Sequence, residues 1–88
     1  MATLQDPANQ AKANFLIIES RVGLTFALIA RDTNDIEKRK RATHDARKAY
    51  DTACKLRNKA QMNDKEQGRL NRNLLRLKEE LHLLGEIF

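Results

Sequence analysis

Apolar residues recur at steps of three and four along the first third of the chain, which is the period of an amphipathic α-helix. An aspartate followed by a proline, Asp6-Pro7, is typical of a helix start. The stripe consists of Ala11, Phe15, Ile18, Val22, Phe26 and Ile29. This spacing predicts a helix over residues 7–32 that turns these side chains toward the core.

A second helix is predicted from Asn34, because Glu37 three residues later completes a capping box. Its inner stripe is Ile36, Ala42, Ala46, Ala49, Tyr50, Ala53, Leu56 and Ala60. A row of alanines at helical spacing lets a neighbouring helix approach closely. We expect this helix to cover residues 35–62.

A third helix is predicted over residues 64–84, starting after Asn63, with Glu66 as the matching glutamate. Its apolar stripe is Leu70, Leu74, Leu77, Leu81 and Leu84. Gly85 suits the left-handed position that follows a last helical turn. Neither glycine nor proline marks the junction at 62–64, so the second and third helices could also run on as one rod, in which Gly68 would cost about 1 kcal/mol relative to alanine.

Three helices of comparable length joined by short connections predict an all-α, antiparallel up-down-up three-helix bundle. With 88 residues and few glycines and prolines, the chain forms a single helical domain over residues 1–88 rather than a many-stranded sheet.

The first helix carries more apolar surface than a free-standing bundle needs. Ile17, Leu24 and Leu28 lie nearly opposite its main stripe, where a helix in such a bundle should be polar. An exposed apolar row of this kind usually marks an interface. We therefore expect a homo-oligomer or another protein partner, anchored by these residues and joined by Leu83, Ile87 and Phe88. The alternative is that the other two helices wrap the first from both sides and cover everything.

The positive charge of the chain belongs to the second helix. Residues 34–62 hold nine basic and four acidic residues, which equals the formal net charge of +5 of the whole chain. The candidate nucleic-acid contacts are Lys40, Arg41, Arg47, Lys48, Lys55 and Lys59. A basic ribbon along one helix is typical of nucleic-acid binding, but acidic residues interrupt it and no aromatic residue lies within it. A solvated face is the ordinary interpretation.

Nothing in the sequence indicates an enzyme or a cofactor. Cys54 is the only cysteine, which excludes an intramolecular disulfide and a zinc site of the usual type and fits a reducing compartment. No phosphate-binding loop or hydrolase motif is present, and no small-molecule substrate is evident. The apolar stretch 15–30 is interrupted by charges and spans about 16 residues, fewer than a bilayer requires. We therefore predict a cytoplasmic protein with no membrane partner.

The segment Ala46-x3-Tyr50-x2-Ala53 resembles the second helix of a tetratricopeptide repeat, in which small residues and an aromatic alternate in this way. The match covers about eight residues, and about three repeats are needed to form a stack. The chain also resembles small uncharacterised bacterial three-helix proteins. These resemblances imply an all-α fold and assign no activity or binding groove. We expect a non-enzymatic protein–protein interaction or self-associating module; the alternative is a nucleic-acid-binding module that uses the basic face of the second helix.

Overall fold

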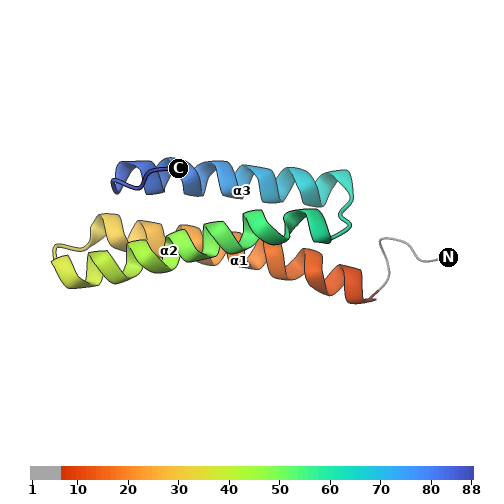
Figure 1. Cartoon of the computed structure of the whole chain (residues 1–88), viewed down its shortest axis with the longest axis horizontal. Coiled ribbons are helices and arrows are strands. Elements are labelled where there is room, and N and C mark those ends of the chain that lie inside the picture. Colours follow the sequence, from red (N-terminus) through yellow and green to blue (C-terminus); the bar gives the residue numbers. More distant parts are fainter. Residues whose placement is uncertain (1–6) are drawn as a thin grey trace.

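The computed structural model describes residues 7–88, which form three antiparallel α-helices and one short 3₁₀ turn (Figure 1). Helix α1 is Pro7–Asp32, α2 is Ile36–Leu56, the 3₁₀ turn η1 is Arg57–Lys59, and α3 is Asp64–Leu83. The helices lie side by side in an elongated molecule with extents of 52 × 18 × 17 Å. The prediction of an all-α three-helix bundle is confirmed.

The helix starts follow from side-chain capping, with one shift from the predicted residue. Asn63 and Glu66 form the predicted capping box at the start of α3. The cap of α2, however, is Asp35 rather than Asn34: its Oδ1 accepts hydrogen bonds from the amides of Glu37 at 3.0 Å and Lys38 at 3.2 Å. A carboxylate at this position is also stabilised by the positive end of the helix dipole. The predicted cap at Asp6 lies outside the described residues.

The second and third helices are separate, and α2 ends at Leu56 rather than near residue 62. The helical path tightens into η1 and then breaks at Ala60, which has extended backbone angles (φ −114°, ψ 134°). Past the end of α3, Gly85 adopts φ 94°, the left-handed conformation predicted for it. The sharp break at Ala60 is what lets α3 fold back along α1.

Helix α1 is the centre of the bundle and packs along both α2 and α3, whereas α2 and α3 touch each other much less. The α1–α2 contact is close because small residues face each other. A Cβ atom added to Gly23 would lie 2.7 Å from Leu77 Cδ2, closer than carbon atoms tolerate, and in tight contact with Ala49 Cβ at 3.0 Å. Gly23 therefore lies where all three helices meet, and a side chain there would force Leu77 and Ala49 to shift.

The inward face of α1 differs from the predicted one. Its buried residues are Ala13, Leu16, Ile17, Ser20, Gly23, Ala27 and Ala30. The stripe that begins Phe15, Ile18 and Val22, predicted to face the core, is largely exposed. The reason is the alanine row of α2: helices that approach closely need small side chains on both surfaces, and a phenylalanine on that side would hold them apart.

The contact between α1 and α3 is built differently, from leucines and one buried hydrogen-bond relay. The inner leucines of α3 are buried as predicted: Leu70, Leu74, Leu77 and Leu81. Ser20, which is fully buried, donates from Oγ to the carbonyl of Ile17 at 2.7 Å and accepts from Nδ2 of Asn73 at 3.0 Å. The relay satisfies the hydroxyl and fixes the register of α3 against α1.

Candidate interaction surfaces

The most exposed apolar surface of a described helix is the side of α1 opposite its two neighbours. It consists of Phe15, Ile18, Val22 and Ile29, and we call it the outer face of α1. The exposed fractions of these residues are 48%, 57%, 39% and 36%, in that order. Thr25 completes their spacing of three and four residues, and no charged residue interrupts the row. This spacing is that of a coiled-coil seam about two heptads long.

The three interface anchors predicted on α1 have different environments. Ile17 is buried in the core with Leu16 and Leu70, so its predicted place on an exposed face is wrong. Leu24 is half-buried, and Leu28 is 36% exposed. These two lie at the side of the helix rather than opposite the core. Helix α1 does expose apolar surface, as predicted, but most of this surface is the outer face rather than the three predicted anchors.

The C-terminal residues predicted to lie at the interface also differ in their environments. Leu83 and Ile87 are among the most exposed large apolar residues of the described chain. Phe88 is 43% exposed, but its ring contacts side chains of both α2 and α3. Its ring meets Tyr50 edge-on with centroids 5.0 Å apart, and the guanidinium of Arg47 lies 4.2 Å from the ring centroid. Part of the Phe88 ring is therefore already covered by side chains of the same chain.

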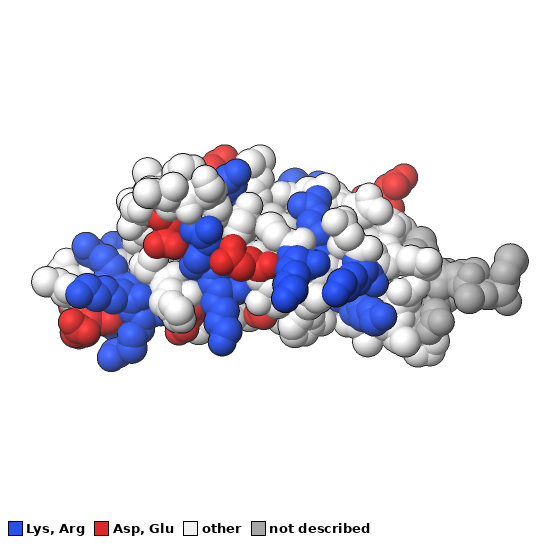
Figure 2. Space-filling view, in the orientation of Figure 1, with Lys and Arg blue, Asp and Glu red and all other residues white. Residues whose placement is uncertain are grey.

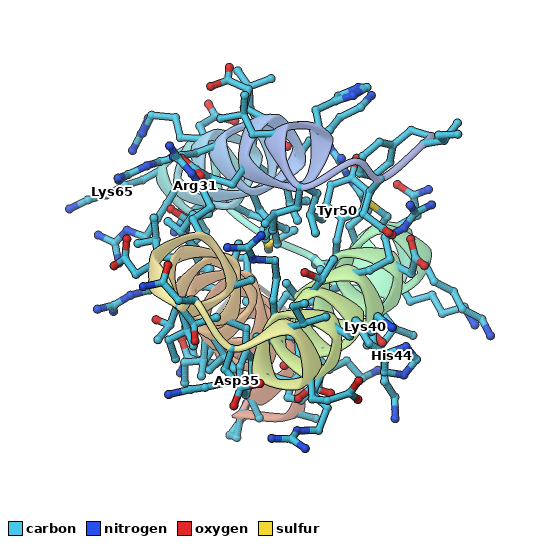
Figure 3. The ribbon with its side chains drawn as sticks, turned by 90° about the vertical axis from the view of Figure 1, so that its left-hand side faces the viewer. Arg31, Asp35, Lys40, His44, Tyr50 and Lys65 are labelled. Atoms are coloured by element: carbon cyan, nitrogen blue, oxygen red, sulfur yellow. The ribbon has the colours of Figure 1, made fainter. Side chains whose placement is uncertain are left out.

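Tyr50 fills the gap that the sparse α2–α3 contact leaves, and Figure 3 shows it between these two helices. Burial raises the pKa of its hydroxyl above the usual value, and a side-chain hydrogen bond with Cys54 acts in the same direction. Both effects favour the neutral phenol. Tyr50 and Cys54 pack against the core, which agrees with a structural role for both.

The basic face of α2 is present but incomplete. Figure 2 shows Lys and Arg side chains along much of this side of the molecule, with acidic side chains between them. The exposed members of the predicted set are Lys40, Arg41, Lys48, Lys55 and Lys59. Lys40 and the neighbouring His44 point outward from α2 (Figure 3).

Arg47 belongs to a different environment from the other predicted basic residues. It is partly buried and forms salt bridges with Asp51 at 3.1 Å and Glu86 at 3.2 Å. It also donates to the carbonyl of Ile87 at 2.8 Å. The hydrogen bond that Arg47 donates to the Asp51 carboxylate is the main reason that the pKa of Arg47 is raised. Arg47 thus joins the C-terminal segment to α2 and is not a free phosphate contact.

Within residues 7–88, no three His, Cys, Asp or Glu side chains are grouped so that they could hold a metal ion. Glu86, near the end of the chain, is paired with Arg47.

Helix α1 is long and apolar enough to cross a membrane by length and composition alone. It has 26 residues, so the prediction that its apolar stretch is too short for a bilayer is wrong. Only 39% of its most apolar window is buried in the bundle. In the structure the same helix packs along its length between α2 and α3, and the cytoplasmic location stays a prediction.

No family model, no curated protein and no solved structure is significantly similar to this chain. The resemblances to a tetratricopeptide helix and to bacterial three-helix proteins stay predictions. The surfaces described above are therefore the basis for assigning a function.

The outer face could have been found from the sequence by comparing two rows of small residues. Ala13, Ser20, Gly23, Ala27 and Ala30 recur in α1 at the same helical spacing as the alanines of α2. Two such rows are complementary, because each permits the close approach that the other needs. The large side chains of α1 would then have been placed on the outside.

Proposed function

We propose that the protein acts by association through the outer face of α1, and that its partner is a second copy of the chain. The observation that carries the proposal is the uncharged row of Phe15, Ile18, Val22 and Ile29, each at least 36% exposed. Exposed apolar rows on small domains usually mark interaction sites. The bundle has its own packed core, so this row is not needed for folding.

The expected strength of the association follows from the exposed area. Burying a large apolar side chain completely is worth about 1.5–3 kcal/mol, so completing the burial of these half-exposed residues gives about 1 kcal/mol each. Four residues from each of two copies then contribute about 8 kcal/mol, from which association subtracts several kcal/mol. We expect a reversible complex with a dissociation constant between micromolar and millimolar.

A second copy is the partner best matched to this face. The row has coiled-coil spacing and is apolar except at Thr25, so an apolar helix is the counterpart that matches it best. An identical α1 meets both requirements. Two-fold dimers are also the commonest soluble oligomers, because a self-complementary patch closes on itself. Leu24 and Leu28, on the same helix, flank this contact.

Sedimentation velocity over a range of concentrations up to about 1 mM tests the association. The wild type should shift from monomer toward dimer, and Ile18→Lys and Val22→Lys should each abolish the shift. Leu75→Lys is the matched control, because Leu75 is a single apolar residue of α3 that is 62% exposed and lies off the outer face. A wild type that stays monomeric throughout, or a control that disrupts the dimer equally, would contradict the proposal.

Nucleic-acid binding is the second candidate, carried by the unpaired charges of α2. Within the described residues, Lys40, Arg41, Lys48 and Lys55 are exposed and form no salt bridge. If all four met phosphates, binding would weaken about 100-fold between 50 and 200 mM salt. A gel-shift titration at these two salt concentrations measures this. Absence of binding at the lower concentration removes the candidate.

A further inference from the structure

A cavity of about 350 Å³ lies at one end of the bundle, between the beginning of α1 and the end of α2. Figure 1 places these two segments at the same end of the molecule. The cavity lining is Ala11, Lys12, Phe15, Leu16, Leu56, Lys59 and Ala60. Its volume is at the lower end of the range for small-molecule sites in proteins.

The break after α2 creates this cavity. The chain leaves the helical path at η1 and becomes extended at Ala60, so α2 does not cover the first turns of α1. Ala11 and Ala60 are small and leave the space open. Two hydrogen bonds join the first turn of α1 to the chain after η1: Asn9 donates to Gln61 of the linker at 2.8 Å, and Gln10 donates to Glu66 in the first turn of α3 at 3.0 Å. The cavity is therefore built into a braced end of the bundle.

Two kinds of chemistry meet in the lining. Phe15, Leu16 and Leu56 supply an apolar wall, and the exposed ammonium groups belong to Lys12 and Lys59. The lining includes no acidic residue, and neither lysine forms a salt bridge with a described residue. Apolar walls with two uncompensated positive charges complement a molecule that has an apolar body and an anionic head.

We propose that this cavity binds a single-chain fatty acid of medium length that has a free carboxylate. The chain lies against Phe15, Leu16 and Leu56, while the carboxylate pairs with Lys12 and Lys59. The concave shape and the small volume favour one free chain over the surface of a bilayer, which would contact a flat or convex face. This site shares Phe15 with the outer face of α1, but Ile18 and Val22 do not line it, so these two residues can be changed without altering the cavity.

Titration of a carboxylate series from hexanoate to dodecanoate into the full-length protein, followed by amide NMR shifts, tests the proposal. Each methylene that enters the cavity should tighten binding about fourfold, until the cavity is full. The largest shifts should come from residues 11–16 and 56–60. The matching alcohols should bind more weakly than the carboxylates, and the matching alkylamines more weakly still.

Three variants separate the head group from the chain. Lys12→Gln and Lys59→Gln should each weaken carboxylate binding by up to about fivefold and leave the binding of the alcohol unchanged. Lys38→Gln, at the opposite end of the bundle, is the matched control and should change neither. Ala60→Leu adds three carbon atoms to the lining and narrows the cavity, so it should weaken binding of both ligands, while its circular dichroism spectrum shows an intact fold.

Four outcomes would overturn the site. They are equal affinity for carboxylate, alcohol and amine; no dependence on chain length; unchanged binding in folded Ala60→Leu; and binding to anionic lipid vesicles but to no free carboxylate. Repeating the titration with Val22→Lys keeps the two proposals apart, since a monomeric protein should still bind the fatty acid.

Discussion

The two faces of α1 follow the same helical period, yet most of the buried side chains are small and a row of large ones is exposed. The inner face contains alanines, Ser20 and Gly23, with Leu16 and Ile17 as its large residues, whereas the outer face begins with Phe15, Ile18 and Val22. Apolar size alone would predict the reverse. The difference shows that the fit between helices outweighs the area that each side chain could bury, because a close helix pair gains contacts along its whole length.

The largest expected effect comes from enlarging the inner face at its tightest point. Gly23→Leu should destabilise the fold by about 3 kcal/mol, because the new side chain collides with Leu77 and Ala49. Thr25→Leu, an exposed change on the same helix, should stay within about 0.5 kcal/mol of wild type at a protein concentration too low for association. Urea unfolding measures both. Equal stabilities would show that the three-helix junction is not tightly packed.

A smaller loss is expected from the buried relay between α1 and α3. Asn73→Ala removes the hydrogen bond to Ser20 Oγ and should destabilise the fold by about 1 kcal/mol. Asn71→Ala, two residues earlier and exposed, is the comparison at a surface site, where it loses only a hydrogen bond from Arg57. Thermal unfolding followed by circular dichroism gives the ranking. A greater loss in Asn71→Ala would contradict the role assigned to the relay.

The outer face should contribute little to the stability of the monomer. Ile29→Ser, measured at a protein concentration too low for association, should change the free energy of unfolding by about 0.5 kcal/mol or less, in keeping with a surface position. At high concentration the same variant should associate more weakly. A loss above about 2 kcal/mol in the dilute monomer would mean that Ile29 belongs to the core.

The smallest effect on stability should come from Tyr50, which lies between α2 and α3 and away from both faces of α1. The pKa of Tyr50 is raised in the folded state, so the neutral phenol is favoured there. The stabilisation from this shift is complete below the unfolded pKa of about 10 and is lost as the pH rises through the folded value. Wild type should therefore lose more stability than Tyr50→Phe above pH 10. Parallel losses in pH-dependent unfolding would contradict this.

The sequence by itself determined the elements of this fold. Helical periods, the Asn63–Glu66 capping box and Gly85 are local signals, because they act within a few residues of one another. They predicted three helices, the start and end of α3 and its buried leucines. The end of α2 at Leu56 had no glycine or proline to mark it, and the break at Ala60 is visible only in the folded chain.

The tertiary structure alone decided which side of α1 is buried. Both of its faces satisfy the helical period, so pattern and hydrophobicity do not choose between them. The choice depends on the alanines of α2 and on Leu77 of α3, which are distant in sequence and meet Gly23 only after folding. The cavity beside Lys12 and Lys59 was decided in the same way, because it exists only where the break after α2 leaves the beginning of α1 uncovered.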